Sequence, residues 1–406
     1  MKKIVIFLII LIILGVSGTF YYNYIENKKQ EELIRNAKIE ITTIDNLDIE
    51  FLTKLKVSDL ITSINGKIVD DYEIDTKKVG KKAVDFIFIN DDNIRLNYSI
   101  DINIVDTVPP LIWNAISYTI VKGNEFDYSN VLCGDNYDSK PECSVIGDYD
   151  TNKIGFYKLE FKAVDSSGNE TTSPFTLNVV ESLSPSKPTN NEIVYKDYSD
   201  IVKNYKTDKT KIGIDVSSWQ GEIDFESLKN AGVEFIIIRV GGNTGTEKEN
   251  FVDKTFYYNI EEANKYGIDV GLYFFSYANS KEHAIRDANW VLDVIKDYDI
   301  SLPIAFDWEN WNYFNSYNLS FYELTEMANA FLDTLSKEGY QGMVYGSKNY
   351  LENMWLEVDY PIWVAQYNSS LSYKGDYLLW QICENGKVDG IKGAVDVDIL
   401  YLQDES

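Results

Sequence analysis

The 406-residue sequence predicts a multidomain protein: an N-terminal membrane helix, two all-β modules and a C-terminal α/β barrel. Three observations support this. An apolar run opens the chain, the first half repeats itself at an offset of 75 residues, and the second half alternates β runs with helical patterns. The expected segments, in order, are an anchor or signal peptide, a juxtamembrane segment, two modules, a linker and the barrel: residues 1–24, 25–37, 38–107, 108–181, 182–210 and 211–404.

The first segment has the composition of a membrane helix. Lys2 and Lys3 precede an apolar run from Ile4 to about Phe20, near the lower limit of length for a membrane span. The tyrosines that follow resemble an interfacial aromatic belt. We therefore expect a single-pass cell-membrane protein whose remaining chain lies outside the cytoplasm. A signal peptide cleaved near "GVSG", which would give a secreted protein, is the alternative.

Composition excludes several classes of function. The formal net charge of -26, from 64 acidic and 38 basic residues, argues against a nucleic-acid partner. A single histidine, His283, excludes Ser-His-Asp triads and multi-histidine zinc sites, and we expect neither a metal nor another cofactor. Carboxylates and aromatic rings are abundant, and these are the groups that a glycosidase requires.

Residues 38–182 contain an internal duplication of short alternating runs. "DTKKVG" at 75–80 aligns with "DTNKIG" at 150–155, and "INIV" at 102–105 aligns with "LNVV" at 177–180. The second copy resembles bacterial Ig-like repeats of surface and secreted proteins. We interpret both copies as sandwiches that act as a spacer, with ligand binding as the alternative. Cys133 and Cys143 are candidates for a disulfide, and the polar residues 182–210 are interpreted as a linker.

The segment after residue 210 predicts a barrel of eight strands. The candidate strands are "KIGIDVS", "FIIIRVG", "VGLYFFSYA", "PIAFDWE", "GMVYGS", "PIWVAQY", "LLWQIC" and "VDVDILY". Helices are expected at 281–298 and 321–338, the second opened by Ser320 and Glu323 in capping-box spacing. The later strands have short connections, so we expect a TIM-like barrel with an incomplete ring of helices.

Strand periodicity brings acidic side chains together. In "PIAFDWENWN", Asp307 and Glu309 share a face with Ala305, because side chains two positions apart in a strand point the same way. By the same argument Asp215 and Asp396 face the barrel pocket. Convergence of like charges favours a protonated carboxyl, which a general acid needs. Aromatic residues with inward parity are expected to wall this pocket: Tyr273, Phe275, Tyr277 and Tyr367.

Six ordered motifs resemble glycoside hydrolase family 25, the Chalaropsis-type lysozymes. They are "GIDVSSWQGEIDFESLKNAGVEFIIIRVG", "ANKYGIDVGLYFFSYA", "PIAFDWE", "PIWVAQY", "LLWQ" and "GAVDVD". The resemblance implies cleavage of the β-1,4 bond between N-acetylmuramic acid and N-acetylglucosamine in peptidoglycan. It also implies Glu309 as proton donor, supported by the acids Asp307, Asp215 and Asp396.

The resemblance places Tyr273, Tyr367 and Trp380 in the substrate groove, with a packing role as the alternative for Trp380. Arg239, in "FIIIRVG", is expected among the substrate-binding residues. The family usually has an Asn two places after the first Asp of "VDVDIL", so the assignment between Asp396 and Asp398 stays open. The favoured hypothesis is a membrane-tethered muramidase with peptidoglycan as its partner. The alternative is a wall-binding surface protein that uses the barrel as a lectin.

Overall fold

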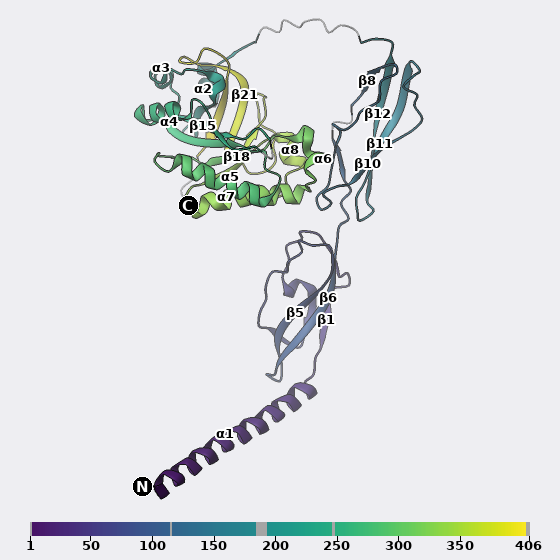
Figure 1. Cartoon of the computed structure of the whole chain (residues 1–406), viewed down its shortest axis with the longest axis vertical. Helices are drawn as coiled ribbons and strands as arrows, with labels where there is room; N and C mark the ends of the chain where they lie inside the picture. Colours follow the sequence, from purple (N-terminus) through teal and green to yellow (C-terminus); the bar gives the residue numbers. More distant parts are fainter. Residues whose placement is uncertain (1, 114–115, 184–192, 246–247, 403–406) are drawn as a thin grey trace. The chain divides into compact units, whose positions relative to one another are not determined.

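The structure, a computed structural model, describes residues 2–113, 116–183, 193–245 and 248–402 (Figure 1). The chain divides into two compact units, Met1–Thr107 and Val108–Ser406. The first unit contains the N-terminal helix and one β-module. The second contains another β-module and the barrel.

The first unit begins with helix α1 (Lys2–Asn36) and continues into a small β-module. The module has a four-stranded sheet in the order β2-β6-β5-β4 and a two-stranded sheet, β1-β3. Its long antiparallel hairpin places Phe86 opposite Tyr98, and Phe86 and Phe88 are buried. The strands are β1 (Ile41–Thr43), β2 (Asp48–Glu50), β3 (Ile61–Ile64), β4 (Gly66–Ile68), β5 (Gly80–Asn90) and β6 (Arg95–Val105).

The second unit begins with a module of the same plan. A four-stranded sheet has the order β10-β11-β12-β8, and β7 pairs with β9. Cys133 in β9 and Cys143 in β10 form a disulfide, so the bond links the two sheets. The strands are β7 (Leu111–Trp113), β8 (Tyr118–Val121), β9 (Leu132–Gly134), β10 (Glu142–Ile146), β11 (Gly155–Val164) and β12 (Glu170–Val180).

The duplication is visible in the structure, but the Ig-like assignment is not supported. The first long strand of each hairpin starts at Gly80 and at Gly155, which are 75 positions apart, as in the sequence alignment. Within the described residues, each module has a four-stranded and a two-stranded sheet. An Ig-type sandwich has at least seven strands in sheets of four and three. These modules therefore lack the strands that define that fold.

The predicted membrane anchor at residues 1–24 is also not supported. Across the part of the chain that the structure describes, no helix has both the length and the apolar composition that crossing a membrane requires.

Eight strands of the second unit close into a barrel, with the neighbour order β14-β15-β17-β18-β19-β20-β21-β22 and back to β14 (Figure 1). Neighbours are parallel from β14 to β21, whereas β22 is antiparallel to both β21 and β14. The strands are β14 (Thr210–Val216), β15 (Phe235–Gly242), β17 (Asp269–Phe275), β18 (Ile304–Asp307), β19 (Gly342–Ser347), β20 (Ile362–Ala365), β21 (Leu379–Lys387) and β22 (Val395–Tyr401). The short strand β16 (Phe251–Val252) pairs with β15.

Helices cover part of the outside of the barrel. The predicted helices at 281–298 and 321–338 correspond to α5 (Lys281–Ile295) and α7 (Phe321–Lys337), and the predicted capping box of Ser320 and Glu323 is present. The remaining helices of this unit are α2 (Tyr198–Tyr205), α3 (Phe225–Asn230), α4 (Phe256–Lys265), α6 (Phe314–Tyr317) and α8 (Lys348–Asn353).

Alternating side chains give the barrel two cores. The inner cluster includes Ile237, Ala305 and Trp363, whereas the outer cluster, under the helices, includes Phe306 and Phe331. Each strand supplies both clusters because successive side chains point to opposite faces.

The predicted TIM-like fold is wrong, although the predicted eight strands are present. A TIM barrel has eight parallel strands, each followed by a helix. Here no helix separates β20 from β21 or β21 from β22, and β22 reverses direction. The barrel therefore closes through an antiparallel strand rather than through an eighth βα unit.

Two further expectations about the region before the barrel fail. Residues 182–210 include β13 (Lys196–Asp197) and α2, and Tyr198 and Ile201 are buried in the outer core, so this part is not a linker. Residues 184–192 lie outside the described residues. Leu132 of the second module belongs to the same buried cluster as the barrel residues. The second module therefore packs on the barrel and is not a spacer.

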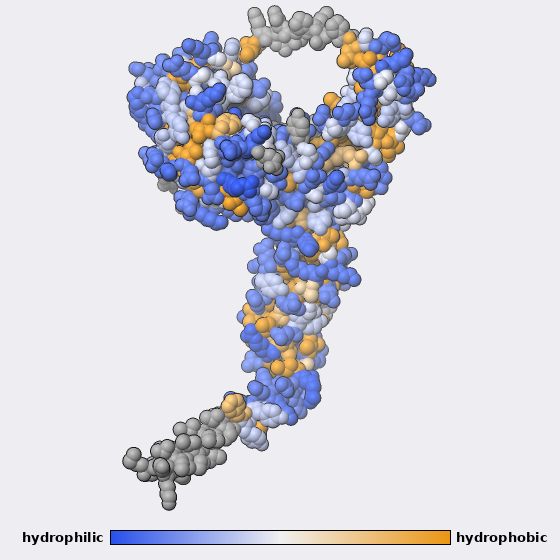
Figure 2. Space-filling model, viewed as in Figure 1, coloured by the Kyte–Doolittle hydropathy of each residue, from blue (hydrophilic) through white to orange (hydrophobic). Residues whose placement is uncertain are grey.

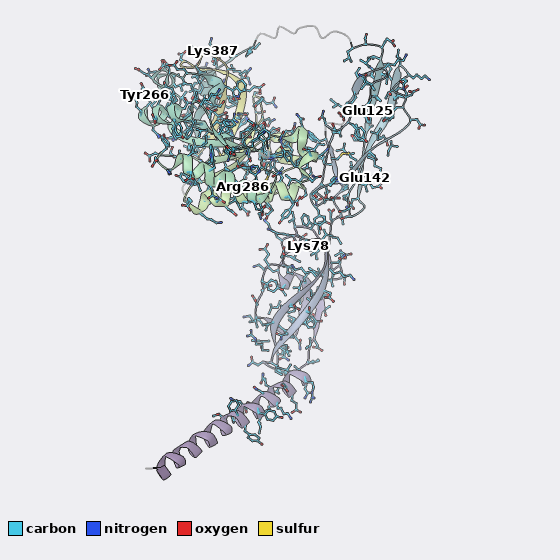
Figure 3. All side chains as sticks on the ribbon, viewed as in Figure 1. Lys78, Glu125, Glu142, Tyr266, Arg286 and Lys387 are labelled. Carbon is cyan, nitrogen blue, oxygen red and sulfur yellow. A yellow bond between two sulfur atoms is a disulfide. The ribbon has the colours of Figure 1, made fainter. Side chains whose placement is uncertain are left out.

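The surface is mainly hydrophilic, as the large acidic excess suggests (Figure 2). Charged side chains extend from the rims of both parts of the second unit, for example Glu125 and Glu142 on the module and Arg286 and Lys387 on the barrel (Figure 3).

Removing a ring from the outer core should destabilise the barrel. The Phe331 ring is fully buried, with centroids 5.9 Å from Phe274 and 5.1 Å from Phe306. Phe331→Ala should lower the free energy of unfolding by about 3–5 kcal/mol, because a buried cavity replaces the ring. Denaturant titration followed by tryptophan fluorescence measures this in the second unit alone, since no tryptophan precedes Trp113. Phe156→Ala is the control, because Phe156 is 78% exposed. An equal loss of unfolding free energy in the two variants would contradict the placement of Phe331 in the outer core.

Candidate active site

Two acids end the strand that opens the site. Asp307 is the last residue of β18, and its side chain follows the parity of Ala305, which lies in the inner core. Trp308 has the opposite parity and is fully buried in the outer core. Glu309 follows beyond the end of the strand and is exposed. Backbone pairing with the neighbouring strands therefore fixes the position of Asp307 but not that of Glu309.

These acids line a pocket of about 250 Å³ at the carboxyl ends of the parallel strands. Among its walls are eight of the ten residues predicted from the sequence: Asp215, Arg239, Tyr273, Phe275, Asp307, Glu309, Tyr367 and Asp396. The pairing brings them together, because Asp307 lies opposite Phe275 in β17 and Asp215 lies opposite Asp396 in β22.

Two predicted residues lie elsewhere. Tyr277 does not line the pocket, and its ring contacts Phe275 at a centroid distance of 5.5 Å. Trp380 is buried on the other face of β21, where its indole N–H donates to the backbone oxygen of Gln366 at 2.9 Å. Its ring packs edge-on against Tyr205. These surroundings agree with the alternative in which Trp380 has a packing role.

Three residues line the pocket that sequence reasoning did not select: Trp219, Tyr345 and Gln381. Trp363 also lines it, and its parity in "PIWVAQY" is the inward parity of Tyr367. Gln381 connects the others, since its amide nitrogen donates to Asp215 Oδ2 at 2.8 Å. Its amide oxygen accepts from the hydroxyls of Tyr345 and Tyr367, each at 3.0 Å. The sequence feature that could have indicated this connecting role is the single amide side chain within the apolar run "LLWQIC".

Asp307 and Glu309 form a coupled pair. Burial raises the pKa of Asp307 well above its usual range, and the charge of the neighbouring Glu309 carboxyl raises it further. The Arg239 guanidinium acts in the opposite direction. Removal of water by the pocket walls also raises the pKa of Glu309. Burial and mutual repulsion therefore favour a protonated carboxyl in this pair.

The second group of acids comes from β14 and β22. Burial raises the pKa of Asp215 well above its usual value, and the charges of Asp396 and Asp398 add to this rise. Asp396 is half-buried, and its burial and the charge of Glu384 raise its pKa to about 6. Asp398 is fully buried and accepts from the indole N–H of Trp363 at 2.8 Å. Of the two candidates, Asp396 faces the pocket, and Asp398 lies behind it.

Arg239 is the single cation among the residues that line the pocket. Its guanidinium carbon lies 5.1 Å from the centroid of the Phe275 ring and 5.6 Å from that of Phe251. Among the described residues, no three of the pocket carboxylates lie close enough together to hold a metal ion. The arrangement suits proton transfer between carboxyl groups beside aromatic rings.

Comparison with known proteins finds relatives of this barrel. Residues 214–391 match the model of the family described as "Glycosyl hydrolases family 25". The chain is 29% identical over 189 residues to the "Autolytic lysozyme" of Clostridium acetobutylicum, covering 46% of this chain and 54% of the relative. It is 29% identical over 202 residues to "Lysozyme M1" of Streptomyces globisporus, covering 45% and 65%. The chain thus spans between half and two thirds of these relatives.

Solved structures are also similar, including the modular autolysin LytC of Streptococcus pneumoniae in complex with a synthetic peptidoglycan ligand. That match has 27% identity and a TM-score of 0.44, and it covers 60% of this chain and 56% of the other. The match of residues 214–391 to the family 25 model and the lysozyme relatives together support a glycoside hydrolase activity for this domain.

Proposed function

We propose that this protein is a muramidase that cleaves the β-1,4 bond between N-acetylmuramic acid and N-acetylglucosamine in peptidoglycan. The observation that supports this most directly is the coupled pair of Asp307 and Glu309 in an aromatic-walled pocket of a family 25 barrel. Glycosidases need one carboxyl to protonate the leaving oxygen and a negative charge beside the cationic sugar that develops.

Glu309 is the proposed proton donor. It is the more exposed member of the pair, so a bound chain can reach it, while Asp307 lies deeper and is 4% exposed. In the free site, burial and the Glu309 charge favour the neutral form of Asp307. The guanidinium of Arg239 favours its ionised form, which the pair needs when Glu309 delivers its proton. The Asp215 and Asp396 carboxyls then support the site from the opposite wall.

The course of the reaction has three alternatives. Retaining enzymes that form a covalent intermediate separate their carboxyls by about 5–5.5 Å, and inverting enzymes by about 6.5–9.5 Å. In the third route, which we propose here, the 2-acetamido oxygen of the substrate attacks and Asp307 orients the amide.

Aromatic rings supply the surface for the sugar chain. Trp219 follows β14 in the turn Ser218–Gln220 and is 87% exposed, although its side chain reaches the pocket. Tyr367, which follows β20, is 45% exposed. Exposed rings beside a polar pocket suit stacking on the apolar faces of sugars.

Glu309→Gln should separate catalysis from binding. The amide keeps the shape of the side chain but cannot deliver a proton, so kcat should fall by about 10²–10⁴-fold. Release of reducing ends from purified walls measures the rate, and co-sedimentation with walls measures binding, which should persist. Glu282→Gln is the matched control, because Glu282 is exposed in the first turn of α5.

Two results would overturn these assignments. A normal rate for Glu309→Gln would show that another group is the acid. Wall binding by the unmodified protein without release of reducing ends would favour the lectin alternative. Mass analysis of the released fragments should find muramic acid at the reducing end, and its absence would contradict the proposed bond.

The gathered acids also predict a pH dependence of stability. The pKa of Asp396 is about 6 in the folded chain, above its ordinary value of 3.8. The folded state therefore binds this proton more tightly, so stability should fall as pH rises from about 4 to about 6. Between pH 4.5 and pH 7 a carboxyl with these two pKa values loses about 2 kcal/mol of stabilisation. Denaturant titrations at pH 4.5 and pH 7 measure this, and Asp396→Asn should reduce the difference. An unchanged difference would contradict the assignment.

A further inference from the structure

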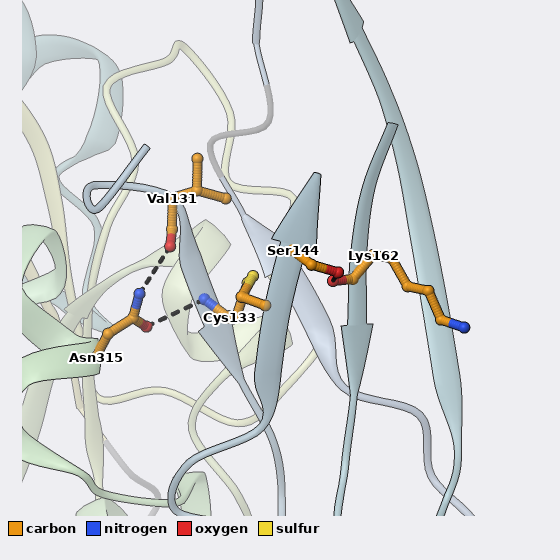
Figure 4. Close-up of a disulfide and its surroundings, with 6 residues drawn as sticks. Val131, Cys133, Ser144, Lys162 and Asn315 are labelled. Carbon is orange, nitrogen blue, oxygen red and sulfur yellow. Dashed lines mark hydrogen bonds between the residues drawn. A yellow bond between two sulfur atoms is a disulfide. The ribbon is translucent and has the colours of Figure 1, made fainter. Parts of the chain in front are cut away.

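The second β-module packs against the segment that follows Glu309. Asn315 in α6 lies at this contact, and its amide Oδ1 accepts from the backbone N–H of Cys133 at 3.1 Å (Figure 4). Its Nδ2 donates to the backbone oxygen of Val131 at 2.8 Å. One side chain thus holds strand β9, and the disulfide to Cys143 ties β9 to the four-stranded sheet of the module.

The residues that follow β9 also contact the start of helix α7. The backbone N–H groups of Phe321 and Tyr322 donate to the backbone oxygens of Asp135 and Asn136, at 2.8 and 3.2 Å. The first N–H groups of a helix have no acceptor within the helix, so the module supplies acceptors for this one. A Cβ atom at Gly134 would lie 2.5 Å from the Phe321 ring, so the close approach depends on glycine.

A series of aromatic contacts joins this interface to Glu309. Trp113 of β7 contacts Tyr350 at a centroid distance of 6.1 Å, and Tyr350 stacks on Trp311 at 4.5 Å. Trp311 packs edge-on against the buried Trp308 at 5.0 Å. The backbone N–H of Trp311 donates to the backbone oxygen of Glu309 at 2.8 Å. Trp308 and Trp311, on either side of Glu309, are therefore connected through Tyr350 to Trp113 of the module.

We propose that the β7–β9 face of the second module, made by Trp113 and residues 131–134, positions Glu309 for catalysis. Glu309 lies beyond the end of β18, so its place depends on the packing of the residues that follow it. This inference rests on the proposed function, since it takes Glu309 as the acid. Asn315 is a positioning residue in this proposal and does not touch the substrate pocket.

Asn315→Ala in the full chain tests the proposal from the barrel side. It removes both hydrogen bonds to β9, and kcat on soluble peptidoglycan fragments should fall by about 10–100-fold, since small displacements of a catalytic group have effects of this size. KM should change little, because the aromatic walls remain. Asn312→Ala is the matched control: both amides have exposed surface in the same segment, but the two hydrogen bonds to β9 belong to Asn315.

The pH profile of kcat distinguishes positioning from a general loss of folded protein. The enclosing walls raise the pKa of Glu309. A loosened segment admits water, which lowers that pKa, so the acid should lose its proton at lower pH. The alkaline limb of the profile should therefore move to lower pH in Asn315→Ala. A smaller folded fraction would lower the rate at every pH without moving the limb.

Gly134→Ala tests the proposal from the module side, at a residue remote from the pocket. Its added methyl should push β9 away from Phe321 and give the same fall in kcat and the same shift of the limb. Gly155→Ala is the matched control in the same module, because its Cβ would meet only ordinary contacts at 3.7 Å.

The outcomes separate this inference from the proposed function. If the unmodified chain releases no reducing ends, the proposed function fails. If it does, and folded Asn315→Ala and Gly134→Ala keep the unmodified kcat and pH profile, the positioning inference fails while the function stands. A fall in rate that follows the folded fraction, with the limb unmoved, also overturns the inference.

Discussion

The pocket depends on keeping several carboxyl groups together in a place that excludes much of the water. Asp215, Asp307 and Asp398 are each less than a tenth exposed, and burial alone would oppose charge on all of them. Hydrogen-bond donors offset part of this cost. The amide N–H of Gln381 donates to Asp215, and the indole N–H of Trp363 donates to Asp398. The same electrostatic cost that raises these pKa values supplies the protonated carboxyl that acid catalysis needs.

The direction of the last strand follows from this arrangement. Because β22 runs antiparallel to β14, Asp396 lies directly across from Asp215, and like charges in that position are unfavourable unless one is protonated. An eighth parallel strand would present its carboxyl end to the pocket together with the others. Here the pocket instead receives the amino-terminal part of β22. Neither strand periodicity nor loop length reveals strand direction, which is why the sequence suggested a TIM-like barrel.

Sequence periodicity predicted what depends on a single strand. The parity of Asp307 in β18, Asp215 in β14 and Asp396 in β22 predicted that these acids would meet, and the structure brings them around one pocket. Glu309 joins them there although it lies beyond the end of β18. Periodicity failed where the strand ends: β17 stops at Phe275, so Tyr277 no longer follows the alternation. It also could not reveal Gln381, whose importance comes from three partners on β14, β19 and the segment after β20.

The duplication explains why the sequence did not reveal the contact of the second module with the barrel. At the 75-residue offset, residues 132–134 of β9 correspond to residues 57–59, which form the short helix Val57–Leu60 in the first module. There Asp59 accepts from the backbone N–H of Lys56, whereas the corresponding Gly134 gives room to the Phe321 ring. The hairpins of the two copies remained alike while this edge diverged. Similar repeats need not share a role, and the difference lies in the segment through which one copy contacts the barrel.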